Sequence, residues 1–231
     1  MTFNFTAVIF DMDGTLFDTE NLCSQCEIRA CAEMGYTMTP EIYLGTVGLP
    51  SHGERGWRAF LLGHYGPDFP IDEVARRTRR YMNEEIAQNG LPIKPGASEL
   101  LDWLDANHIP RAIASSSACE NIAHHLERVG WTNRIDLFVG GDEIAHGKPA
   151  PDIFLEAARR LCVSPLQCVA FEDSEAGVRS AHAAAMHVIM IPDLKLPSDE
   201  VRALANHVLP SLNEAQALLS QSEVQVEKRE I

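Results

Sequence analysis

The sequence predicts an α/β fold: a Rossmann-like three-layer core with a parallel sheet, and an all-helical cap domain inserted after its first strand. Short β-rich apolar runs recur between helical patterns, which is typical of βαβ units and a buried parallel sheet. A long stretch after the first run has helical spacing and no comparable strand. The length of 231 residues suits one main domain with a smaller attached module.

The predicted strands are the apolar runs, taken in chain order. They comprise residues 7–10, 111–114, 137–139, 168–171, 188–191 and a weaker run at 207–209. Between 15 and about 91, side chains such as Leu22, Cys26 and Ala30 follow helical spacing instead. This difference predicts that the first strand is followed by a helical insertion.

The insertion ends in a Pro and Gly cluster, residues 91–96, before a new helix with Leu100, Leu101 and Leu104 on one face. We therefore assign 1–14 and 95–231 to the core domain, and 15–94 to the helical cap domain with its hinge segments. The polar tail, 220–231, is expected to fray.

Charge excludes several classes of partner. The chain has 19 Lys plus Arg against 33 Asp plus Glu, a net charge of −14. This charge repels nucleic acid and anionic membrane surfaces, so neither is an expected partner. No apolar run is long enough for a membrane span and no signal peptide is evident, which favours a cytoplasmic protein.

The six cysteines are scattered and are interpreted as reduced thiols. Cys23 and Cys26 form a C-x-x-C, but no second pair or nearby His completes a zinc set. Packing on a helix face is the favoured interpretation of this pair.

Polar residues follow the predicted strands at the edge where an open α/β sheet binds ligands. Asp11 and Asp13 follow the first strand, and two residues apart on an extended segment they project to the same side. Ser115 and Ser116 follow the second strand, offering hydroxyl and N–H groups to a bound anion. Lys148, which follows the third strand and precedes Pro149 and Pro151, is a candidate to bind phosphate.

Glu172 and Asp173 follow the fourth strand. Because clustered carboxylates repel one another, we expect them to bind a hard divalent cation. Oxygen ligands without His favour Mg²⁺ as that cation.

These four motifs together resemble the haloacid dehalogenase superfamily, in its phosphatase and phosphomutase branch with a helical cap. The resemblance rests on D-M-D-G-T, the Ser motif, G-K-P-x-P and E-D-S-x-A-G, and it extends from about residue 7 to 193. It implies that Asp11 is the nucleophile that forms an aspartyl phosphate and that Asp13 is the general acid and base. It assigns Ser115 and Lys148 to phosphate binding. It assigns Asp11, Asp13 through its carbonyl, Glu172 and Asp173 to the Mg²⁺ environment.

Two enzyme functions fit this resemblance. The leading one is a Mg²⁺-dependent phosphatase acting on a small phosphorylated metabolite, for example a sugar phosphate. The alternative is a phosphomutase of the β-phosphoglucomutase type, but three mutase positions differ here. Cys23 stands where the mutase pattern has a His, residues 48–51 lack its Arg, and Ala118 replaces its Lys.

A non-enzymatic, phospho-accepting receiver module is disfavoured, because receivers are about half this length and lack a second Asp two residues after the first. The sequence leaves the oligomeric state open, and a monomer is compatible with it.

Overall fold

The structure is a computed structural model and describes residues 3–49, 53 and 56–224. The chain divides into two compact units. The sheet unit comprises residues 1–18 and 93–231, and the helical unit comprises residues 19–92. Within the described residues, no helix is both long and apolar enough to cross a membrane.

The sheet unit contains a six-stranded sheet in the order β4-β3-β2-β5-β6-β7, in which every neighbouring pair is parallel. Each of the six predicted strands is present. Their bounds are Ala7–Phe10 (β2), Arg111–Ser115 (β3), Leu137–Gly140 (β4), Cys168–Glu172 (β5), His187–Met190 (β6) and His207–Val208 (β7). The predicted α/β class is therefore confirmed.

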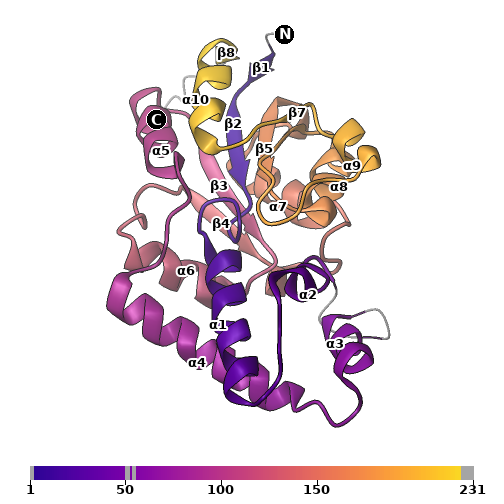
Figure 1. The fold of residues 1–231 in the computed structure, drawn as a ribbon. Helices are drawn as coiled ribbons and strands as arrows, with labels where there is room; N and C mark the ends of the chain where they lie inside the picture. The colour runs from indigo at the N-terminus through magenta and orange to yellow at the C-terminus, as the bar shows by residue number, and fades with distance from the viewer. Residues whose placement is uncertain (1–2, 50–52, 54–55, 225–231) are drawn as a thin grey trace. The chain divides into compact units, whose positions relative to one another are not determined.

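Strand β2 lies between β3 and β5 and is wholly buried, which explains its uninterrupted apolar sequence. Ala7 and Ile9 belong to a core formed with Ile153 and Phe154 of one helix and Val178 of another. Alternation along the strand turns Val8 and Phe10 to the opposite face. Helices thus cover both faces of the sheet (Figure 1), as in a three-layer core.

The helices of this unit separate into two groups on either side of the sheet (Figure 1). One group contains α7, α8 and α9, and α5 packs against α10 in the other. Helix bounds are Ala97–Ala106 (α5), Cys119–Arg128 (α6), Asp152–Leu161 (α7), Glu175–Ala183 (α8), Asp199–Leu204 (α9) and Leu212–Ser220 (α10), with short 3-10 turns at Gly141–Glu143 and Pro165–Gln167.

The tail differs from the sequence prediction. Strand β8, Glu223–Val224, pairs in parallel with β1, Asn4–Phe5, so the expected fraying from residue 220 is wrong as far as residue 224. The pairing satisfies backbone groups that a polar composition alone does not reveal. Residues 225–231 lie outside the described part of the chain.

The helical unit consists of α1 (Thr19–Glu33), α2 (Pro40–Leu44), α3 (Trp57–Tyr65) and α4 (Ile71–Asn89). Its main packing is between α1 and α4. Among the described residues of this unit there is no strand, as its helical spacing predicts. The segments that lead into and out of it meet at Phe17, which bridges to Asp13 and to Ile93.

Candidate active site

The carboxyl ends of four neighbouring strands, β4, β3, β2 and β5, bring together the polar residues that the sequence predicts there. Asp11 follows β2, Ser115 ends β3, and Glu172 ends β5. The strand order reverses at β2, because the chain first adds β3 and β4 on one side and later β5 and β6 on the other. Ligands bind at such reversals in open α/β sheets.

Lys148, in the loop after β4, lies between two carboxylates. Its Nζ donates to Asp11 Oδ1 and to Glu172 Oε1, each at 2.5 Å. The lysine side chain is 6% exposed and that of Glu172 is fully buried. A buried charge needs a close partner of opposite sign, so the three groups hold one another in place.

Protonation in this triplet follows from burial and charge. Burial raises the pKa of Asp11, and Lys148 opposes that rise. Burial lowers the pKa of Lys148, but Asp11 and Glu172 more than offset this and raise it overall. Lys148 is therefore a fixed cation among acids.

Asp11, Glu172 and Asp173 also form a cluster that suits a metal ion, with one oxygen from each within 4.8 Å of the others. Burial and the neighbouring acids Asp11 and Glu172 raise the pKa of Asp173 well above its usual value. A cation relieves that cost, and an all-oxygen donor set fits Mg²⁺. The residues present thus fit the predicted ion.

Gly14 shapes the same corner. Its φ of +86° is in the left-handed region, and a Cβ built on it would overlap the Asp173 carboxylate. Thr15 Oγ1 lies 3.5 Å from Asp173 Oδ1. A side chain at residue 14 would displace the acid that faces the cluster.

The remaining predicted residues are Asp13, Ser115 and Ser116, and Ser117 links the first two. Ser117 Oγ donates to Asp13 Oδ2 at 2.9 Å, and the Ser117 N–H donates to Ser115 Oγ at 3.1 Å. Ser115 is buried, whereas Ser116 is exposed. Ser117, which was not among the predicted site residues, therefore contacts Asp13 directly; it could have been found as the last hydroxyl of the Ser-Ser-Ser motif.

The glycine of the E-D-S-x-A-G motif has a structural reason. A Cβ at Gly177, in α8, would overlap the Glu172 carboxylate. Ser174 Oγ receives the Gly177 N–H at 3.1 Å and donates to Glu172 Oε2 at 3.1 Å. The close approach of this helix fixes the oxygen of Glu172 that Lys148 does not hold.

Replacing Gly177 by alanine is expected to lower the free energy of unfolding by about 1–3 kcal/mol, because the added methyl group forces the buried carboxylate to move. Urea denaturation measures this. The control is Gly63→Ala in α3, where nothing lies within 4 Å of the added Cβ, and where stability should stay equal or rise by up to about 1 kcal/mol. Equal stability of both variants would contradict the close fit.

Sequence reasoning missed one buried ion pair. Lys94 Nζ donates to Asp193 Oδ1 at 2.6 Å and lies 3.5 Å from Asp18 Oδ1. Asp193 Oδ2 is buried without a hydrogen-bond partner and lies 3.3 Å from the Cβ position of Gly14. Asp193 follows β6, so the strand-end rule could have found it, whereas nothing in the sequence distinguishes Lys94.

Other polar motifs lie elsewhere. His146 is exposed and its Nδ1 is 2.9 Å from Asp152 Oδ1. Cys26 is buried in α1, and the six thiols are free. Within residues 3–49, 53 and 56–224, the acidic cluster at Asp11 is the one group with metal-ligand geometry. Pro50 and Ser51, part of the mutase comparison, lie outside the described residues.

Comparison with known proteins gives consistent relatives. A protein described as "Probable pseudouridine-5'-phosphatase" from Drosophila melanogaster is 38% identical over 213 residues, 90% of each chain. A Deinococcus radiodurans HAD family hydrolase, solved with phosphate and sodium, matches with a TM-score of 0.79 and 28% identity, over 94% of this chain and 96% of that one.

CbbY from Rhodobacter sphaeroides, a mutant solved with xylulose-(1,5)bisphosphate, matches with a TM-score of 0.69 and 26% identity, over 91% of this chain and 96% of that one. Residues 8–191 match the family described as haloacid dehalogenase-like hydrolase. Since this match covers most of the chain, including the strand-end motifs, the chain belongs to the haloacid dehalogenase-like hydrolases.

Proposed function

We propose that this enzyme is a Mg²⁺-dependent phosphatase that hydrolyses a small phosphorylated metabolite, of the sugar phosphate class, through an aspartyl phosphate on Asp11. The observation that carries the proposal is the position of Lys148, 2.5 Å from both Asp11 Oδ1 and Glu172 Oε1 at the strand ends. A fixed cation beside a nucleophilic carboxylate offsets the repulsion between that carboxylate and a phosphate dianion.

Asp11 and Asp173 are the proposed side-chain ligands of Mg²⁺, with the Asp13 carbonyl. Both oxygens of Glu172 already accept hydrogen bonds, from Lys148 and Ser174, so Glu172 supports the site through its charge. When bound, Mg²⁺ supplies charge stabilisation to the transferring phosphoryl group.

The proposed cycle has two steps, transfer of the phosphoryl group to Asp11 and its release to water. An Asp11 carboxylate oxygen attacks phosphorus, the bond from phosphorus to the leaving oxygen breaks, and Asp13 gives that oxygen a proton. Water then attacks phosphorus, the bond to Asp11 breaks, and Asp13 takes the proton from water. The Ser117 hydroxyl, 2.9 Å from Asp13 Oδ2, orients the Asp13 carboxyl. Ser115, Ser116 and Lys148 bind the phosphate.

Water is the proposed acceptor, in preference to a second sugar hydroxyl. Cys23 cannot supply the imidazole of the mutase pattern, and burial raises the pKa of its thiol to about 12, so it stays neutral. Ala118 likewise lacks the basic group of that pattern. In this proposal the helical unit, residues 19–92, is a cap that excludes water and contacts the leaving group.

The test is a panel of phosphorylated metabolites with Mg²⁺, following phosphate release. It includes pseudouridine 5′-phosphate, a hexitol phosphate and β-glucose 1-phosphate with a trace of the 1,6-bisphosphate. We expect release of phosphate from at least one monophosphate and no rapid formation of glucose 6-phosphate. Rapid isomerisation with little free phosphate would make the enzyme a mutase instead.

A further inference from the structure

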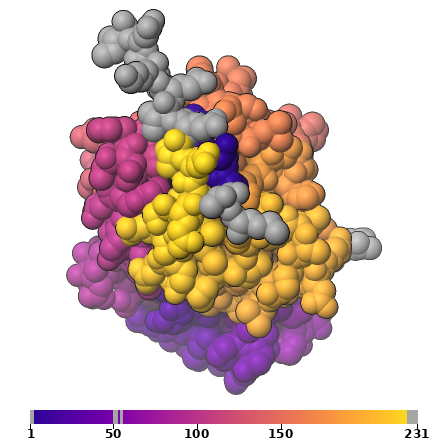
Figure 2. Space-filling view, turned by 90° about the horizontal axis from the view of Figure 1, so that it is seen from above, coloured from indigo at the N-terminus to yellow at the C-terminus, as the bar shows by residue number. Residues whose placement is uncertain are grey.

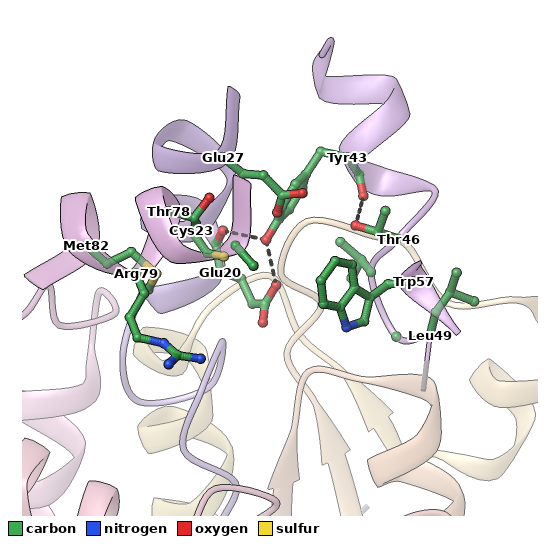
Figure 3. A pocket seen from close by; sticks show the side chains of 13 residues that line it. Glu20, Cys23, Glu27, Tyr43, Thr46, Leu49, Trp57, Thr78, Arg79 and Met82 are labelled. Atoms are coloured by element: carbon green, nitrogen blue, oxygen red, sulfur yellow. Dashed lines mark hydrogen bonds between the residues drawn. The ribbon is translucent and has the colours of Figure 1, made fainter. Parts of the chain in front are cut away.

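The helical unit contains a cavity of about 380 Å³ that the chemistry at the strand ends does not use. Its lining residues come from α1, α2, α3 and α4 and from residues 46–49 after α2, and their side chains turn toward a common space (Figure 3). A cavity of this size accommodates a group as large as a sugar or a nucleoside. The polar groups that line it decide which chemistry it accepts.

The hydroxyl groups in the lining already donate their hydrogens to oxygen atoms of the protein. Tyr43 Oη donates to Glu20, with the backbone oxygen and the carboxylate Oε2 both at 3.3 Å. Thr46 Oγ1 donates to the Tyr43 carbonyl at 2.7 Å, and Thr78 Oγ1 donates to the Val74 carbonyl at 2.9 Å. These residues can therefore offer a ligand lone pairs but no free hydroxyl hydrogen.

The polar groups of the lining that remain available to a ligand are mainly hydrogen-bond acceptors and negative charges. Glu20 and Glu27 both line the cavity, and Arg79 is the one basic side chain among its described lining residues. Burial, together with the Glu20 carboxylate, raises the pKa of Glu27 to about 7. An environment that already resists one carboxylate charge resists an added phosphate more strongly.

Apolar and aromatic surface supplies the rest of the lining. Trp57 presents its indole ring to the cavity, and Leu49 and Met82 also line it (Figure 3). A flat or ring-shaped group can pack on such a surface while its edges reach the carboxylates. Arg79 can donate to one carbonyl or hydroxyl oxygen of the same group.

We propose that this cavity binds an uncharged organic group rich in O–H or N–H donors, and that it selects monophosphates over bisphosphates. The inference rests on the proposed function, because the bound group is the part of the substrate that remains after phosphate is removed. A nucleoside and a polyol share this donor chemistry. A second phosphate, which brings only acceptors and charge, does not.

The experiment compares matched substrates in the full-length enzyme with Mg²⁺. Glucose 6-phosphate is paired with glucose 1,6-bisphosphate, and pseudouridine 5′-phosphate and sorbitol 6-phosphate distinguish the two sources of donors. The readout is the ratio of kcat/KM for the monophosphate to that for the bisphosphate. General damage to folding or catalysis lowers both values and leaves the ratio unchanged.

The wild-type ratio is expected to be at least ~10, as one close charge pair can produce. In the double variant Glu20→Gln with Glu27→Gln, the ratio should fall by ~10-fold, since the shape remains and the charge is lost. Glu84→Gln is the matched control, because Glu84 is half-exposed, pairs with Arg80 and is not in the lining. It should leave the ratio unchanged.

A wild-type preference for the bisphosphate, or an equal ratio in the double variant, would overturn the inference. Preference for either pseudouridine 5′-phosphate or sorbitol 6-phosphate supports it and identifies the source of the donors. Hydrolysis of p-nitrophenyl phosphate distinguishes a failure of this inference from a failure of the proposed function. If it is hydrolysed while the bisphosphate is preferred, only this inference fails, whereas inertness toward every phosphate ester removes the proposed function and this inference together.

Discussion

Replacing Asp11 by asparagine is expected to reduce phosphate release by ~10⁴-fold or more while the fold is retained, because the amide cannot act as the nucleophile. Asparagine has nearly the same shape, and its amide oxygen can still accept the hydrogen bond from Lys148 Nζ that Asp11 Oδ1 accepts. Steady-state phosphate release with the best substrate measures the loss.

Urea denaturation of the same Asp11→Asn preparation checks that the protein is folded. Asp102→Asn is the matched control, since Asp102 lies on α5 with a side chain that is 72% exposed and paired with Arg134. Its activity should equal that of the wild type. Turnover of Asp11→Asn within tenfold of the wild-type rate would contradict the assignment of the nucleophile.

Removing divalent metal with EDTA is expected to abolish turnover, and adding Mg²⁺ should restore it. The reason is the acidic cluster of Asp11, Glu172 and Asp173. One carboxylate oxygen from each lies within 4.8 Å of the others, and a bound cation offsets the repulsion between these acids. Asp173→Ala should raise the Mg²⁺ concentration for half-maximal activity by ~10-fold or more. Phosphate release across a Mg²⁺ titration measures both effects.

Binding of the metal can be followed without turnover. Mg²⁺ should raise the melting temperature of the wild type, and less so that of Asp173→Ala, because a ligand of the native state stabilises it. Burial raises the pKa of Asp173, and Mg²⁺ binds the ionised form. The stabilisation by Mg²⁺ should therefore decrease as the pH falls through that raised pKa. Full activity in metal-free buffer would contradict a metal-dependent reaction.

The sheet could be predicted from sequence because buried parallel strands are read directly as apolar runs. Strand β2 is buried at every residue, and β3 and β5 are as well, so nothing in them resembles a helix face. Strands β1 and β8 are two residues each and carry no such pattern. Their pairing depends on contacts between the two ends of the chain, which local composition does not contain.

The candidate site could be anticipated to the extent that it depends on strand ends. Once strands β4, β3, β2 and β5 are neighbours, the residues after them must approach one another, as Asp11, Lys148 and Glu172 do. Their catalytic roles stay predictions. The pairing of Lys94 with Asp193 could not be anticipated, because it joins residues 99 positions apart through loops without a pattern.

The cavity in the helical unit could not be predicted from the sequence either. The hydrogen bonds that the cavity can offer a ligand depend on which hydroxyl groups already donate within the protein, as those of Tyr43 and Thr78 do. Such internal hydrogen bonds follow from packing. Helical spacing locates these residues on helices but does not show that Glu20 and Glu27 line the same space. Sequence patterns therefore predict the proposed chemistry better than the proposed selectivity.

The proposed function requires that Asp11 carries the phosphoryl group during turnover. Its most direct test is acid quenching of the enzyme in steady state with substrate and Mg²⁺, followed by mass spectrometry of the peptide that contains residues 11–13. We expect a mass increase of one phosphoryl group (about 80 Da) on Asp11, formed only with substrate and absent in Asp11→Asn. Turnover with no adduct at any quench time, or an adduct on another residue, would contradict it.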